Sequence, residues 1–283
     1  MEQPTRLQDV LDGPRDPVAL ARLLVARTNE EREAAVVAYL THRGLPFTRH
    51  AFTSSEGRGE NFQVDMGSGD RILVLAAHHD AVAGSPGAND NAVAVGILLS
   101  LAETLARRPP TRLRVRFVFP AAEELGYLGA RCYVQDRPLD GIVGVLSLEL
   151  CGIGDSLVLW DAPDETSFLR ALTTALERLG RRRDESYHVV GHIPVFGSDH
   201  RAFAAAGIPA YGLSVVPARE AEALRQFVLN PMQSPFAASG RIPAPFDTYH
   251  TPGDALSTLD PAAAAAVFAG LESIVTDLDR ARP

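Results

Sequence analysis

The chain has 283 residues, of which 46% are hydrophobic, and a formal net charge of -8 at pH 7. This length and composition can bury the core of one large α/β domain, so we expect a single domain over residues 1–283. The acidic balance and the lack of a long run of Lys and Arg argue against a nucleic-acid-binding protein.

Cysteine content and hydropathy bear on the compartment. The chain has two cysteines, Cys132 and Cys151, and no apolar leader near its start, which favours a cytoplasmic protein. The longest uninterrupted apolar stretches reach about half of the roughly 20 residues that a bilayer-spanning helix needs. We therefore expect no membrane segment.

Apolar periodicity predicts the elements along the chain. Residues 1–45 are expected to contain one or two helices, because apolar residues recur at helical spacing over 16–45 and the pattern stops at Gly44. A short strand pattern follows at 47–52. Beyond it, strand-length runs rich in Leu and β-branched residues alternate with helical patterns. The expected strands are 71–78, 112–120, 141–150, 155–162 and 208–216, and the expected helices are 91–108, 165–180, 199–207 and 261–280.

This alternation predicts the α/β class, with a mixed, largely parallel central sheet covered by helices on both faces. Ligand sites in such sheets lie at the carboxyl ends of the strands. Residues 230–254 contain too many helix- and strand-breaking residues for a regular element and predict a long loop. Long loops inside a compact domain are often functional.

The first long strand ends in polar residues. Strand alternation directs His78 and Asp80 to one side and His79 to the other. Asp80 can then orient the neighbouring imidazole, as carboxylates do for metal-binding histidines, whereas His79 is interpreted as a polar strand end in solvent. Asp90 stands just before a helix, where a carboxylate also serves as an N-cap.

Further carboxylates follow the next two strands. Glu123 and Glu124 are adjacent, and two like charges are unfavourable to bury side by side unless a cation or a shared proton compensates. Glu149 interrupts a run that is expected to be buried on both faces. Cys151 is interpreted as a buried inert thiol rather than a ligand, and His250 lies in the long loop.

Together, these positions supply two imidazoles and four carboxylates at strand ends and in one loop. Such N and O donors suit borderline-hard divalent metals, with zinc first and manganese or cobalt as alternatives. The set exceeds the needs of one tetrahedral zinc. Two ions roughly 3.5–4 Å apart, bridged by a carboxylate, would account for the surplus and are a known arrangement for hydrolysis.

Six ordered motifs resemble the co-catalytic dizinc aminopeptidases related to aminopeptidase Y, bacterial leucyl aminopeptidase and glutamate carboxypeptidase, and the likeness covers about 71–259. The motifs are HHD, GANDN, AAEELGYLGA, LELCGIGD, SDHRAFAAAGIPA and YHTPGD. The resemblance implies a zinc-peptidase fold with two zinc ions per chain. It also implies that Asp90 bridges both ions, with His78 and Glu149 completing one site and Glu124 and His250 the other.

The same resemblance implies catalytic roles. Glu123 would be the general base and Asp80 the residue that orients His78. Tyr249 would be a phenol that stabilises the tetrahedral oxyanion, the alternative being an ordinary loop aromatic. Most members have Asp where this chain has Glu149, so either the longer side chain completes the first site or that site is weak or empty. Residues 198–200 resemble a loop near the substrate pocket and are interpreted as helix-capping residues.

The activity implied is hydrolysis of the first peptide bond of a peptide, or of a small amide, with a free N-terminus. Two alternatives remain open. A glutaminyl cyclase shares this fold and much of the motif set but works with a single zinc and releases ammonia from N-terminal glutamine. A catalytically inactive relative would instead serve as a peptide-binding domain. The residues predict neither the oligomeric state nor the side-chain specificity.

Overall fold

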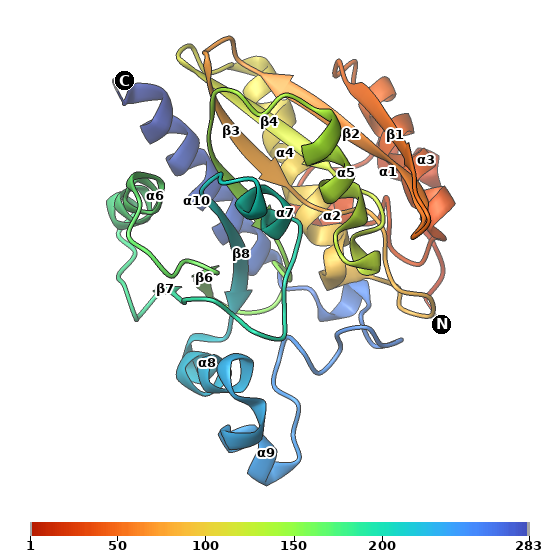
Figure 1. Cartoon of the computed structure of the whole chain (residues 1–283). Coiled ribbons are helices and arrows are strands. Elements are labelled where there is room, and N and C mark those ends of the chain that lie inside the picture. Colours follow the sequence, from red (N-terminus) through yellow and green to blue (C-terminus); the bar gives the residue numbers. More distant parts are fainter. Residues whose placement is uncertain (1, 282–283) are drawn as a thin grey trace.

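The computed structural model describes residues 2–281 and is built on one eight-stranded sheet (Figure 1). The strand order across the sheet is β1-β2-β4-β3-β5-β8-β6-β7. The strands are β1 (Thr48–Thr53), β2 (Arg58–Met66), β3 (Arg71–Ala76), β4 (Leu113–Phe119), β5 (Ile142–Leu148), β6 (Ser156–Trp160), β7 (Tyr187–Val189) and β8 (Ala210–Val216).

The sheet is parallel in its centre and mixed at its edges. Neighbours β4, β3, β5 and β8 run parallel. On one side β2 is antiparallel to β4 and to β1, and on the other β6 is antiparallel to β8. The predicted mixed, largely parallel sheet is therefore confirmed.

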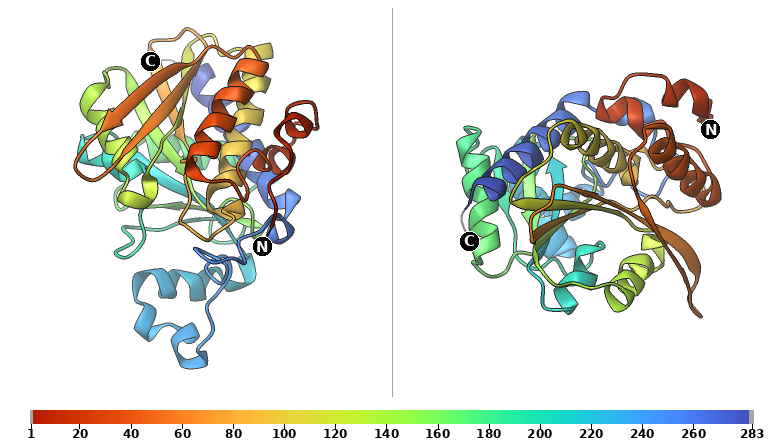
Figure 2. Two further views of the ribbon diagram at one scale, coloured as in Figure 1. Left: turned by 90° about the vertical axis from the view of Figure 1, so that its right-hand side faces the viewer. Right: turned by 90° about the horizontal axis from the view of Figure 1, so that it is seen from above.

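Helices cover both faces of the sheet, as the two views of Figure 2 show. One face carries α2, α4 and α10, and the other carries α5 and α7. The central strands are buried on both sides: β3 places Leu73 and Leu75 in the main core and Val74 in a second cluster beneath α5 and α7. The helices are α1 (Leu7–Leu11), α2 (Pro17–Ala21), α3 (Asn29–His42), α4 (Val93–Arg107), α5 (Leu128–Asp136), α6 (Ser167–Arg178), α7 (His200–Ala205), α8 (Ala221–Leu229), α9 (Pro235–Ser239) and α10 (Pro261–Arg280).

The C-terminal helix α10 belongs to the core. Over its 20 residues it is long and apolar enough, by length and composition, to cross a membrane, although its uninterrupted apolar run is shorter. In the fold it packs on α4 and α6 and buries Val267, Leu271 and Ile274 in the main core. Its apolar residues are thus accounted for by packing within the chain.

Several elements lie where the sequence patterns predict none. Strand β2 exposes part of its length and carries Arg58, Glu60 and Asp65, so it lacks the apolar run of a central strand. Helices α5 and α8 are only nine residues long and offer little periodicity. The predicted loop over 230–254 is confirmed for most of its length but contains the short α9. Together, α8 and α9 form a lobe that projects beyond the sheet (Figure 1).

Candidate metal centre

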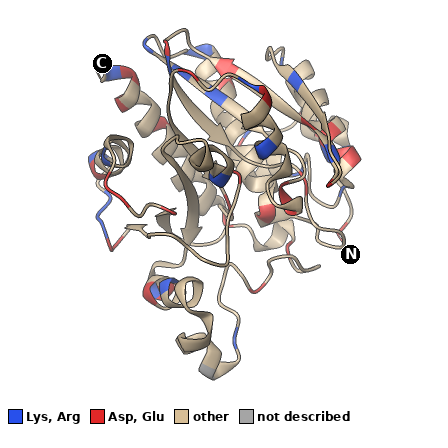
Figure 3. Ribbon diagram, in the orientation of Figure 1, with Lys and Arg blue, Asp and Glu red and all other residues tan. Residues whose placement is uncertain are grey.

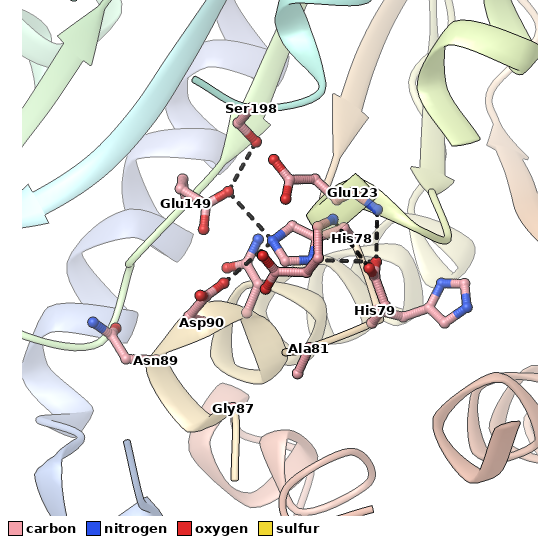
Figure 4. A network of polar contacts seen from close by, with 12 residues as sticks. His78, His79, Ala81, Gly87, Asn89, Asp90, Glu123, Glu149 and Ser198 are labelled. Atoms are coloured by element: carbon pink, nitrogen blue, oxygen red, sulfur yellow. Dashed lines mark hydrogen bonds and ion pairs between the residues drawn. The ribbon is translucent and has the colours of Figure 1, made fainter. Parts of the chain in front are cut away.

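The predicted donors converge at one edge of the sheet. Loops directly after β3, β4 and β5 carry His78, the Glu123–Glu124 pair and Glu149. Since these strands are parallel neighbours, their carboxyl ends meet at the same edge, where the side chains of His78, Glu123 and Glu149 point toward one another (Figure 4). Asp90 lies in a turn before α4, and the loop after α9 brings His250 back to the group. We call these six residues the His78 centre.

Asp90 lies between the two histidines. Its Oδ1 is 3.4 Å from His78 Nε2, and its Oδ2 is 3.1 Å from His250 Nε2. Glu149 Oε2 lies 3.4 Å from the same His78 nitrogen, and Glu124 Oε2 lies 3.1 Å from the same His250 nitrogen. Each oxygen of Asp90 therefore faces one imidazole and one further carboxylate, as a bridge between two cations would require.

The donor atoms form two groups that could each hold a metal ion, and within each group they lie within 4.8 Å of one another. One group is Asp90, Glu124 and His250. The other is His78, Glu149 and Glu123, so the carboxylate that is expected to act as a base lies beside the donors of His78 and Glu149. This closeness suits either a ligand or a base beside the ligands.

The centre holds more negative charge than its own residues neutralise. Burial raises the pKa of Glu124 to about 7, and the nearby Asp90 adds to the rise. Burial also raises the pKa of Glu123 well above its ordinary value. For His78, burial lowers the pKa, but the Glu149 and Glu123 carboxylates outweigh it and hold that pKa well above the ordinary value. Within the described residues, the buried oxygens Glu124 Oε1 and Glu149 Oε1 have no hydrogen-bond partner. Such a donor set fits divalent cations.

Asp80 makes more contacts than its predicted role of orienting His78 requires. Its Oδ1 lies 3.5 Å from His78 Nδ1, as expected for a carboxylate that orients the ring. It also accepts hydrogen bonds from the backbone N–H groups of Glu123 (3.0 Å) and Glu124 (3.2 Å). The turn that these bonds hold begins at Ala122, whose φ of 54° is left-handed. One buried carboxylate thus positions three residues of the centre.

His79 corrects an expectation. It is only 1% exposed rather than in solvent, and its ring packs on Phe62 with 5.5 Å between centroids. The strand end is covered on this side, and burial lowers the pKa of His79 to about 4. In Figure 4 the ring points away from the other donors, in agreement with strand alternation.

Neither the capping alternative for Asp90 nor the capping interpretation of residues 198–200 agrees with the structure. Asp90 lies before α4, but the N-cap of that helix is Ala92, with no side-chain cap bond. Likewise, Asp199 stands at the N-cap of α7 and makes no side-chain cap bond. Instead, Ser198 donates a hydrogen bond to Glu149 Oε2 at 2.8 Å. Asp199 is fully buried, and burial raises its pKa to about 8. Asp199 therefore occupies the N-cap position without capping the helix, and Ser198 contacts Glu149 instead.

Two further residues support the centre although nothing in the patterns assigned them a role. Asp254 accepts hydrogen bonds from the backbone N–H groups of Asn89 (2.7 Å) and Asp90 (3.0 Å). Arg32, fully buried in α3, donates to the carbonyl of Pro86 at 2.6 Å. Both anchor the turn that carries Asp90. Asp254 could have been identified from the sequence, because it is the last residue of the YHTPGD motif that contains His250.

Tyr249 and Cys151 occupy places consistent with their predicted roles. The Tyr249 ring stacks on His250 with 3.7 Å between centroids. Burial raises the pKa of its phenol, and the charge of Asp90 adds to the rise, so the group stays protonated and able to donate. Cys151 is buried, and its thiol donates to the Leu213 carbonyl at 3.4 Å, as expected for an inert thiol.

Solved structures with the same fold include aminopeptidases and glutaminyl cyclases. A zinc aminopeptidase from Bacillus subtilis superposes with a TM-score of 0.62 at 21% identity, covering 81% of this chain and 53% of that one. The glutaminyl cyclase of Porphyromonas gingivalis superposes with a TM-score of 0.69 at 15% identity, covering 98% of this chain and 100% of that one. At these identities the likeness shows the fold alone.

Sequence relatives are peptidases by name. The probable lipoprotein aminopeptidase LpqL of Mycobacterium tuberculosis is 28% identical in an alignment of 178 positions that covers 56% of this chain and 35% of that protein. Leupeptin-inactivating enzyme 1 of Streptomyces exfoliatus is 31% identical in an alignment of 180 positions that covers 60% of this chain and 39% of that protein. The chain thus spans well under half the length of either relative. Residues 62–275 match peptidase family M28, and because this match covers most of the chain, the chain belongs to that family.

Proposed function

We propose that this chain is a zinc-dependent aminopeptidase that removes the first residue of peptides with a free N-terminus. The observation that carries the proposal is the placement of Asp90, whose two oxygens face His78 and His250 separately. The membership in a peptidase family and the solved zinc aminopeptidase with the same fold support it.

Two ions per chain suit the donors. His78, Glu149 and Asp90 would hold one ion, and Asp90, Glu124 and His250 would hold the other. Zinc at these positions would polarise the substrate carbonyl and lower the pKa of a water from 15.7 toward about 7. Manganese or cobalt would be accepted by the same N and O donors.

The residues around the ions divide the remaining work. Glu123 is placed to take a proton from the attacking water and to return it to the leaving amine. The protonated Tyr249 phenol would donate to the oxyanion that develops on the carbonyl. The centre has more carboxylates than histidines. This excess of negative charge, to which Glu149 contributes, would also balance the positive charge of the substrate's free amine.

A cavity of about 330 Å³ next to Glu149 and Tyr249 would receive the side chain of the first residue. Its walls include Trp160, Phe196 and Phe246. Apolar walls favour a large apolar or aromatic side chain, because such a side chain leaves water on entering.

Glutaminyl cyclase is the second candidate, favoured by the near-complete mutual coverage with the enzyme from Porphyromonas gingivalis. Mass spectrometry of two peptides, one beginning with Leu and one with Gln, separates the candidates. We expect loss of the first residue from both. Loss of ammonia from the Gln peptide alone would show a cyclase. An N-acetylated Leu peptide is the control and should stay intact, and absence of any reaction would favour the inactive relative.

A further inference from the structure

The cavity beside the His78 centre has its floor on one face of the strands β8, β6 and β7, which end the sheet on one side. Strand alternation sends Leu157 and Tyr187 into the main core and turns Val158 and His188 to the cavity. On the same face α7 packs over the Ala210 end of β8, but none of its residues lines the cavity. The roof is the lobe, through Leu224 and other residues of α8. The cavity therefore lies where the lobe, rather than α7, covers this face of the sheet.

Strand register shows where the cavity ends. Leu148 on β5 pairs with Leu213 on β8, which places Glu149 level with Ser214. Ser214 pairs with Val158 on β6, and Val158 pairs with His188 on β7. The row from Glu149 to His188 therefore crosses three strand spacings, about 14 Å between backbones. All four side chains line the cavity, with His188 at the end opposite the centre.

The far end of the cavity is polar, in contrast to its apolar walls. Asp184, His188, Glu222 and Arg225 line this end, and Figure 3 shows that the charged residues of the lobe gather on α8. His188 Nδ1 lies 3.9 Å from Asp184 Oδ1. His188 Nε2 is buried and has no hydrogen-bond partner among the described residues. A buried ring nitrogen without a partner is costly unless a ligand satisfies it.

The surroundings select the tautomer of His188. A carboxylate near Nδ1 favours the proton on that nitrogen, which leaves Nε2 as a hydrogen-bond acceptor. Burial also lowers the pKa of His188, with Arg225 adding to the fall and Asp184 and Glu222 opposing it, and the lower pKa favours the neutral ring. At this end of the cavity, His188 Nε2 can therefore accept a hydrogen bond from a ligand that donates one.

We propose that His188 is a specificity-determining residue that accepts a hydrogen bond from the tip of the substrate's first side chain. A side chain with an apolar aromatic body and a donating tip fits, so tyrosine is preferred over phenylalanine. This inference rests on the proposed function, since it names the substrate class of that site. Phenylalanine would leave Nε2 unpaired, and we expect a preference of about tenfold to hundredfold for tyrosine.

The test compares Tyr and Phe, which differ only in the hydroxyl, in two assays on the zinc-loaded protein. The first measures kcat/KM for Tyr and Phe 4-nitroanilides. The second measures binding of L-tyrosinamide and L-phenylalaninamide to Glu123→Gln by calorimetry, which needs no turnover. Failure of the proposed function stops the first assay but leaves the second, so the two failures are distinguishable.

Three variants give the decisive contrast. His188→Leu should reduce the Tyr/Phe ratio to about one, because the acceptor is lost. His188→Gln, which keeps an acceptor, should restore part of the preference. The control is His192→Leu, since His192 lies four residues away with 66% of its side chain exposed, and its ratio should stay that of the wild type.

Several results would overturn the inference. One is a binding ratio near one in the protein with His188 intact. Another is a ratio that His188→Leu leaves unchanged while thermal unfolding shows the variant to be folded. A preference for Lys over Tyr that survives His188→Leu would mean that Glu222 or Asp184, rather than His188, selects the tip. If His188→Leu does not fold, the partial preference of His188→Gln decides.

Discussion

The His78 centre and a second buried group around Asp161 use similar residue types with opposite electrostatic results. Asp161 accepts hydrogen bonds from the Ile193 N–H (2.7 Å), from His200 Nε2 (3.0 Å) and from Arg201 Nε (2.7 Å). We call these four residues the Asp161 cluster. Burial raises the pKa of Asp161, but His200 and Arg201 outweigh it and hold the pKa well below its ordinary value. This carboxylate is fully matched by donors within the chain.

The His78 centre lacks such a match (Figure 4). Carboxylates crowd two histidines, and burial raises the pKa values of Glu123, Glu124 and Glu149 although the charge of His78 opposes the rise. The buried Arg32 nearby donates to backbone carbonyls. Acidic residues alone therefore do not mark a metal site. Unmatched buried negative charge does, because it needs a cation from outside the chain.

Backbone conformation distinguishes the two regions less well. Left-handed φ values occur at Leu150 (53°) and His250 (59°) in or beside the His78 centre. Asp161 in the matched cluster also has a φ of 56°. Such conformations are costly for residues other than glycine and often mark functional sites. Here they accompany both a matched and an unmatched cluster, so charge is the better criterion.

Removal of metal should have the largest effect. We expect a strong chelator to abolish peptide hydrolysis and to lower the thermal unfolding midpoint, because the unmatched carboxylates lose their cations. Zinc at 100 times its dissociation constant would stabilise the fold by about 2.7 kcal/mol per site. Added zinc, cobalt or manganese should restore activity. Full activity in protein that elemental analysis shows to be metal-free would mean that the His78 centre needs no external cation and does not differ from the Asp161 cluster in this respect.

Variants of the adjacent Glu123 and Glu124 should separate catalysis from metal binding. Glu123→Gln should keep both metals and lower kcat by about 10²–10⁴, the usual worth of a positioned general base. Glu124→Gln should lose metal as well, since Glu124 faces His250 in the second donor group. Metal content and kcat measured on the same preparations decide, and the reverse pattern would show that the two roles are exchanged.

Glu149→Ala should reduce bound metal from two ions to about one, because Asp90, Glu124 and His250 would still hold the second ion with water as a further ligand. Its matched comparison is Asp161→Ala, which should keep two ions but destabilise the fold by about 3–5 kcal/mol by leaving Arg201 without its partner. A count of two in Glu149→Ala under the same dialysis would remove that residue from the ligand set.

Much of the fold and the centre could be predicted from the sequence, because the central strands are buried on both faces. Their long apolar runs make His78, Glu123 and Glu149 stand out as polar interruptions at strand ends. Strand β2 could not be predicted, since half-exposed strands mix polar and apolar residues. Burial of His79 against Phe62 depends on β2 and was missed for the same reason.

The supporting contacts were missed for a different reason. Ser198 bonds to Glu149, and Asp254 bonds to Asn89 and Asp90, across separations of 49 to 165 residues. No local pattern encodes a hydrogen bond between segments so far apart, because their approach is set by the packing of the whole sheet. The lobe and its cavity were missed as well. Helix α8 is too short to show a clear helical period in the sequence.

The smallest expected effect concerns Asp254, which contacts the centre only through backbone groups. Asp254→Ala removes the acceptor for the N–H groups of Asn89 and Asp90, so the turn that carries Asp90 should loosen. We expect metal affinity to fall about 10–100-fold, as for other residues that orient metal ligands, with two ions still bound at saturation. The control is Asp260→Ala, which removes an exposed N-cap carboxylate from α10 and should cost about 1 kcal/mol of stability with metal affinity unchanged. Equal metal affinity in the two variants, measured by competition with a chelator, would show that the turn holds Asp90 without Asp254.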